Sequence, residues 1–226
     1  MPFQGFADKD AKFFKALSRN QSREWFQAHK TEFEEGYQAP MKALLAEVAA
    51  QVDATFEFCD LDEPKVFRLN RDVRFSKDKS PYKTHIGGLI PTRRRGKVTE
   101  VPMALYFHVG LPRSFAAAGH YMMSSDQLVK FRAAVADDKR GRELDQLLVK
   151  LRKKGYSIDS HDRYKRVPKG YDPEHPRADH LKRKGLTVGF PELPPGILAE
   201  EKLVSLLVRH VKAAAPLVEW LAFASA

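Results

Sequence analysis

The stretch Met103-Ala-Leu-Tyr-Phe-His-Val109 alternates in polarity and decides the fold class. In an extended chain one side holds Leu105, Phe107 and Val109. The other side holds Ala104, Tyr106 and His108. Residues 114–122 are also expected to form a strand, and they follow after a short turn that contains Gly110 and Pro112. Two such segments joined by a short turn are typical of a hairpin, so the pattern predicts an antiparallel sheet.

Helical patterns precede this hairpin. Residues 1–53 carry apolar stripes at helical spacing, with Ser22 as a helix cap and Pro40 in the first turn of a third helix. We therefore expect a helical block over 1–53.

Further helices and one strand follow the hairpin. Ser124 begins a capping box, and a second helix is expected at about Lys139–Lys154. The stretch 186–190 predicts a late edge strand, and 197–224 predicts two closing helices interrupted by Pro216. Because helices and strands occur in separate blocks, we expect an α+β fold with a mainly antiparallel sheet. Residues 1–226 are expected to form a single domain, in which the 1–53 block packs on a 65–226 α+β body.

The chain is basic, and its charge is concentrated. It has 226 residues, a formal net charge of +10 and a single cysteine, Cys59. Residues 65–113 hold twelve Lys or Arg against three acids. A local surplus of this kind favours anionic partners. The single cysteine excludes an intramolecular disulfide, and no apolar run is long enough for a membrane span, so we expect a cytoplasmic protein without a membrane partner.

The most chemically loaded segment is residues 65–85, KVFRLNRDVRFSKDKSPYKTH. If it is extended, one face holds Arg68, Asn70, Asp72, Arg74 and Ser76, and the other holds Phe67, Leu69, Val73 and Phe75. Arg71 falls on the apolar side, where an unpaired charge is costly. We expect either a bulge at Arg71 or a partner from elsewhere, such as Glu24 or an incoming anion.

Guanidinium and ammonium groups in this segment are natural ligands for phosphates and carboxylates. The candidate ligand-binding residues are Arg68, Arg71, Arg74, Ser76, Asp78, Lys79, Tyr82 and Lys83. The expected partner is an anionic or phosphate-bearing ligand, with nucleic acid as the macromolecular candidate.

Two other interpretations remain open. Asp72, His108 and His120 are weak candidates for a catalytic group in a small-molecule enzyme, such as a metal-assisted hydrolase, with arginines clamping the substrate. Alternatively, the Arg and Asp residues form a structural ion-pair lattice that fixes the turn at 78–81.

Other chemistries have weak support. His161, His175 and His180 share a polar loop, but their spacing fits no closed metal site, so no metal is predicted. Cys59 lies among acids, which raise the pKa of a thiol. The dinucleotide-binding and Walker motifs are absent from the sequence, so the common dinucleotide and nucleoside-triphosphate folds are unsupported and the cofactor is unknown.

The string Arg68–Lys83 resembles the signature of DUF2461, an uncharacterised family of bacterial and fungal proteins. The sequence is also similar to that family's pattern at 3–6, 20–26, 115–121 and 166–170, so the resemblance covers nearly the whole chain. It implies membership of the family and brings no established activity, substrate or catalytic residue.

Overall fold

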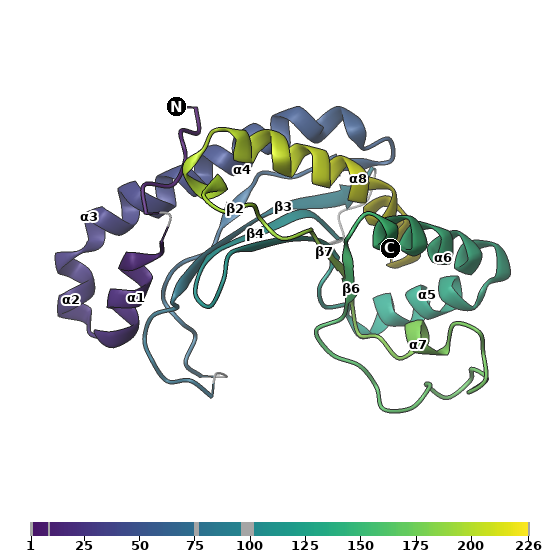
Figure 1. Ribbon diagram of the computed structural model, residues 1–226. Coiled ribbons are helices and arrows are strands. Elements are labelled where there is room, and N and C mark those ends of the chain that lie inside the picture. The colour runs from purple at the N-terminus through teal and green to yellow at the C-terminus, as the bar shows by residue number, and fades with distance from the viewer. Residues whose placement is uncertain (1, 9, 75–76, 96–101, 226) are drawn as a thin grey trace.

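The sheet of this protein carries two long helices on one face and further helices at both ends (Figure 1). The computed structural model describes residues 2–8, 10–74, 77–95 and 102–225. The N-terminal helices lie at one end of the sheet, and a second group, α5 to α7, lies at the other. This arrangement confirms the predicted α+β class.

The N-terminal block consists of α1 (Lys12–Arg19), α2 (Arg23–Ala28), α3 (Lys30–Phe33), the π-helical turn η1 (Glu34–Gln38), α4 (Ala39–Val52) and the 3-10 turn η2 (Asp53–Thr55). The Ser22 hydroxyl accepts a hydrogen bond from the Trp25 amide at 3.1 Å and so caps α2 as predicted. Asp8 links two parts of the block, because its Oδ2 accepts hydrogen bonds from the Phe13 amide (2.8 Å) and from the Tyr37 hydroxyl (2.6 Å). Burial and this bond raise the pKa of Tyr37.

All strand pairings are antiparallel, in the order β1-β3-β4-β5-β7-β6, and β2 also pairs with β3. The strands are β1 (Cys59–Leu61), β2 (Lys65–Val66), β3 (His85–Arg94), β4 (Met103–Gly110), β5 (Phe115–His120), β6 (Ser157–Asp159) and β7 (Leu186–Gly189). The long central strands β3 and β4 therefore supply the frame on which the site residues are placed.

The remaining helices are α5 (Ser125–Ala136), α6 (Asp138–Lys153), α7 (Ala178–Leu181), the 3-10 turn η3 (Ile197–Ala199) and α8 (Lys202–Ser225). Ser124 and Gln127 form the predicted capping box of α5. Among the residues that the structure describes, none of the helices combines the length and apolar composition that crossing a bilayer requires.

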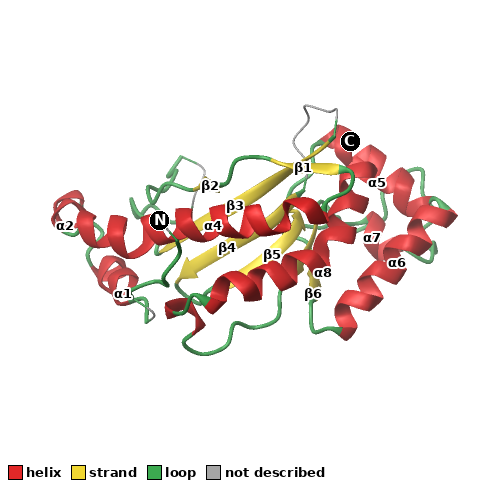
Figure 2. Cartoon of the chain, turned by 90° about the horizontal axis from the view of Figure 1, so that it is seen from above, coloured by secondary structure: helices red, strands yellow, loops and turns green. Residues whose placement is uncertain are grey.

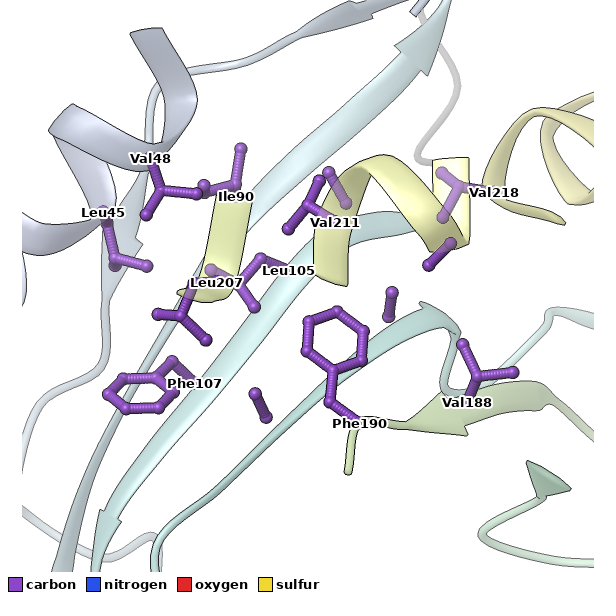
Figure 3. Close-up of a cluster of buried hydrophobic side chains, with 14 of the residues drawn as sticks. Leu45, Val48, Ile90, Leu105, Phe107, Val188, Phe190, Leu207, Val211 and Val218 are labelled. Atoms are coloured by element: carbon purple, nitrogen blue, oxygen red, sulfur yellow. The ribbon is translucent and has the colours of Figure 1, made fainter. Parts of the chain in front are cut away.

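Helices α4 and α8 lie side by side over one face of the sheet (Figure 2). Alternate strand residues face these helices, and in Figure 3 they interdigitate with helix side chains. The labelled residues of this core are Leu45, Val48, Ile90, Leu105, Phe107, Val188, Phe190, Leu207, Val211 and Val218. The core is apolar and closely packed, so this face of the sheet is closed to ligands.

Three expectations about individual elements were wrong. The expected loop at 91–97 is strand β3 as far as Arg94, and Pro91 lies at a register shift, where a bulge accommodates its missing amide. Residues 96–97 lie outside the described residues. β7 pairs with both β5 and β6, so it is internal to the sheet and β6 is the edge.

The two closing helices are one helix, α8, with Pro216 in its interior. A proline there removes a hydrogen bond and costs about 3 kcal/mol. Burial of neighbours such as Leu217 and Val218 offsets that cost.

Gly88 lets α4 approach the sheet, and its replacement tests this packing. A Cβ added at Gly88 would lie 2.5 Å from Leu45 Cδ1, so Gly88→Ala is expected to lower the free energy of unfolding by about 1–3 kcal/mol in urea titration. Gly36→Ala is the control, because a Cβ there meets nothing within 4 Å, and it should stabilise by roughly 0.5–1 kcal/mol. Equal stability of the two variants would contradict this account.

Candidate functional site

Residues 67–84, which we call the signature loop, connect β2 to β3. Only Lys65–Val66 are strand, so the predicted extended run through Ser76 is wrong. The loop closes on itself through a bridge between Asn70 and Tyr82 and through the amide of Lys83, which donates to the Leu69 carbonyl at 2.9 Å. Aspartates and a proline favour turns over a regular ladder, which explains why the strand stops early.

Two side chains anchor the signature loop. Leu69 and Tyr82 are each 4% exposed. The Tyr82 ring lies 4.6 Å from that of Phe26 on α2, and its amide donates to Gln21 Oε1 at 3.0 Å. The loop is therefore fixed to the N-terminal helical block. This identifies Tyr82, a predicted ligand residue, as an anchor.

The expected apolar face of this segment does not form. Phe67 is 41% exposed and Val73 is 38% exposed, whereas Leu69 is buried. Phe75 and Ser76, the latter a candidate ligand residue, lie outside the described residues. Because the chain leaves the sheet after Val66, period-two alternation no longer separates a buried side from an exposed one.

Arg71 finds its partner within the loop. Its Nη2 lies 2.9 Å from Asp78 Oδ2, and the guanidinium also donates to the carbonyls of Ser80 (3.2 Å) and Tyr82 (3.3 Å). The expected partner Glu24 is not used. Hydrogen bonds from Ser80 and then the charge of Arg71 lower the pKa of Asp78. Arg71 thus crosslinks the two sides of the signature loop, which corresponds to the structural interpretation.

A second pair lies on the exposed side of the loop. Arg74 donates from Nε to Asp72 Oδ1 at 3.0 Å and from Nη2 to Asp72 Oδ2 at 2.8 Å. These hydrogen bonds lower the pKa of Asp72, which remains a carboxylate. Lys79 Nζ donates to the Val73 carbonyl at 2.8 Å. Asp72, Arg74 and Lys79 are therefore engaged locally.

Arg68 and Lys83 lie together at the junction of the loop and the sheet. Lys83 Nζ donates to the Arg68 carbonyl at 3.0 Å, and Arg68 is exposed. Partial burial, followed by the charges of Arg68 and Arg71, lowers the pKa of Lys83. His85 lies beside this group, and burial together with His108, Lys83 and Arg71 lowers its pKa to about 4.

The candidate histidines lie on opposite faces of the sheet. His108 pairs with Phe115 in the β4–β5 ladder and stacks on His85, with ring centroids 4.1 Å apart. His120 points toward α8, where its Nδ1 lies 3.3 Å from Ser225 Oγ. The constellation of Asp72, His108 and His120 is therefore not brought together.

His85 is not among the ligand or catalytic residues predicted from the sequence, although it stacks on His108. The signal is present, because Ile86, Gly88 and Ile90 alternate with it and all face the helices. Extending the strand from 85 would have placed His85 beside His108.

The other candidate groups do not form a site. The structure places His161 against Tyr121, His175 against the Arg177 amide and His180 near Asp145. In the described residues no group of three His, Cys, Asp or Glu side chains could hold a metal ion. Burial, followed by Glu219 and Asp60, raises the pKa of Cys59 to about 12.

A cavity of about 640 Å³ lies at the turn between β4 and β5 and contacts the segment 189–196. Lys15, Arg113 and Glu192 contribute charges of both signs to its lining. None of the predicted ligand or catalytic residues lines it.

The chain matches the model of one protein family. The model of DUF2461, described as a conserved hypothetical protein, matches residues 9–220 and confirms the resemblance seen in the sequence. Neither a curated protein nor a solved structure matches the chain.

Arg71→Ala is expected to destabilise the fold, because it removes a donor from two carbonyls and the charged partner of Asp78. We expect a loss of about 1–3 kcal/mol in the free energy of unfolding, measured by urea titration. Arg74→Ala is the matched control, since the Arg74 side chain is 75% exposed, and its unfolding midpoint should stay close to that of the wild type. Equal losses in both variants would exclude the crosslinking role.

His120 makes stability depend on pH. Burial lowers its pKa to about 4 in the folded protein, whereas an unfolded histidine has a pKa of about 6.5. Between these values the unfolded state binds the proton and the folded state does not, so stability is complete above pH ~6.5 and falls toward pH ~4. In His120→Asn, urea titrations over this range should show a shallower loss, by up to about 1.4 kcal/mol per pH unit. An unchanged slope would contradict the assignment.

Proposed function

Because the chain belongs to the DUF2461 family of conserved hypothetical proteins, a description that names no activity, we propose its function from its own geometry. We propose that it binds a phosphate-bearing ligand, with nucleic acid as the macromolecular candidate. The site is the junction of the signature loop with β2 and β3. Its cations are Lys65, Arg68 and Lys83, which we call the basic rim.

The observation that carries this proposal is the proximity of Lys83 to Arg68, because Lys83 Nζ donates to the Arg68 carbonyl at 3.0 Å. Burial, followed by the charges of the Arg68 and Arg71 guanidinium groups, lowers the pKa of Lys83. Like charges held close together cost free energy. A bound phosphate would offset that repulsion and would gain hydrogen bonds from Arg68 and Lys83.

The basic rim differs from four arginines of the 65–113 region, which form ion pairs. Arg71 and Arg74 pair with aspartates of the signature loop, and Arg93 and Arg95 pair with Asp60 or Asp62 on the β1 side. Within the described parts of the chain, no ion pair is formed by a residue of the basic rim. The rim therefore keeps its charge available for an external anion.

Salt dependence tests the proposal. A fluorescently labelled oligonucleotide should bind with an affinity that falls steeply with salt, because each phosphate contact releases counterions. The double variant Arg68→Ala, Lys83→Ala should weaken binding and reduce the slope of log K against log salt by roughly 1–2. Inorganic tripolyphosphate should compete with the oligonucleotide for the wild-type protein.

The double variant Arg93→Ala, Arg95→Ala is the control, since it removes the same charge from residues that already have acidic partners. It should bind nearly as the wild type does. Affinity that is insensitive to salt, or an equal loss in both double variants, would refute the proposal.

A further inference from the structure

The sheet face opposite α4 and α8 carries no helix in the described parts of the chain (Figure 1). The strand registers place every second residue on it. From β2 to β5, and just beyond each strand, this open face holds Lys65, Phe67, His85, Gly87, Leu89, Tyr106, His108, Phe115, Ala117, Gly119 and Tyr121. Rings and small residues dominate this set.

The rings form a continuous row across the strands. His108 stacks on His85 at 4.1 Å and on Phe115 at 4.7 Å, with interplanar angles of 26° and 20°. Tyr106 lies 5.8 Å from Phe115 and 6.4 Å from Phe67. We call Phe67, His85, Tyr106, His108 and Phe115 the aromatic row.

The ends of the aromatic row are exposed. Phe67 is 41% and Phe115 is 36% exposed, whereas Phe107, on the helix-covered face of the same sheet, is fully buried. Tyr121, at 55% exposure, extends the ring surface beyond β5, and its hydroxyl contributes after burial to raising the pKa of Tyr106. Adjacent exposed aromatic rings of this kind mark a binding surface more often than isolated ones.

Gly87 leaves room for the rings of Phe67 and Tyr106 above the backbone of β3. A Cβ at Gly87 would lie 2.9 Å from the Tyr106 hydroxyl and 3.4 Å from a ring carbon of Phe67. The rings of Phe67 and Tyr106 therefore lie over the backbone of β3, where a side chain would displace them.

The basic rim borders the aromatic row. Lys83 Nζ lies 6.0 Å from the centroid of the Phe67 ring, and Lys65 shares the face of Leu89 next to it. An exposed ring next to a cation, as Phe67 is to Lys83, matches a ligand that alternates phosphates with planar bases. Phe67 and Phe115 lie 6.4 and 5.8 Å from the Tyr106 ring between them, so the row offers more than one ring on which bases can stack.

We propose that the open face binds a single-stranded nucleic acid, with its bases stacked on the aromatic row and its phosphates on the basic rim. This inference rests on the proposed function and adds to it the form of the ligand. Bases of a single strand expose their ring faces, whereas those of a duplex are already stacked on one another. Antiparallel sheets with aromatic side chains are a recurrent platform for such strands.

Fluorescence anisotropy with a labelled oligothymidylate and with a duplex of equal phosphate number tests the inference. Phe67→Leu and Phe115→Leu remove a ring but keep an apolar side chain. Each should weaken single-strand binding by roughly 5- to 100-fold and leave duplex binding unchanged. Phe58→Leu is the control, because Phe58 is 47% exposed but contacts Phe223 of α8 edge-to-face, away from the row.

The outcomes separate the two proposals. If single strand and duplex bind equally, and only the Arg68→Ala, Lys83→Ala variant is weakened, the stacking inference fails and the proposed function stands. If neither oligonucleotide nor tripolyphosphate binds, both fail. A dimer in sedimentation that dissociates in Phe67→Leu and Phe115→Leu would assign the open face to a second copy of the chain and overturn the inference.

Discussion

Burial of α4 and α8 against one face of the sheet is the constraint on which the rest of the structure depends. The two helices contact each other and the central strands, and they bury nearly every apolar residue that those strands offer on that side. Both helices therefore pack on the same face of the sheet. The opposite face carries Tyr106 and His85 together with the exposed rings of Phe67 and Phe115, and no helix of the described residues covers it in Figure 1.

The fold class could be predicted because the deciding signals are local. The alternation of 103–109 and the caps at Ser22 and Ser124 depend only on neighbours in the sequence, and each appears in the structure as expected. The extent of α8 could not be predicted, because long-range burial overrides the break that Pro216 suggests. The same holds for β3, whose continuation through Pro91 depends on a bulge against β4.

The sequence shows which charged residues make up the signature loop. It does not show how the loop is folded. The basic segment was identified, but alternation alone assigned it to a strand, and the ion pairs that fold it back join residues several positions apart, such as Arg71 and Asp78. Arg68 and Lys83 were among the predicted ligand residues, whereas His85, Phe67 and Phe115 were not. Their common face follows from the strand registers, which depend on where each strand begins and on the turns and bulges between strands.

The anchoring of the signature loop on the helical block has a mechanical consequence. Tyr82 joins the loop to Phe26 and Gln21, and Phe26 in turn contacts Phe33 in the aromatic cluster around Tyr37. Lys83 follows Tyr82 directly in the chain, so this packing fixes the position of Lys83 relative to α2. The N-terminal helices thus hold one end of the basic rim in place.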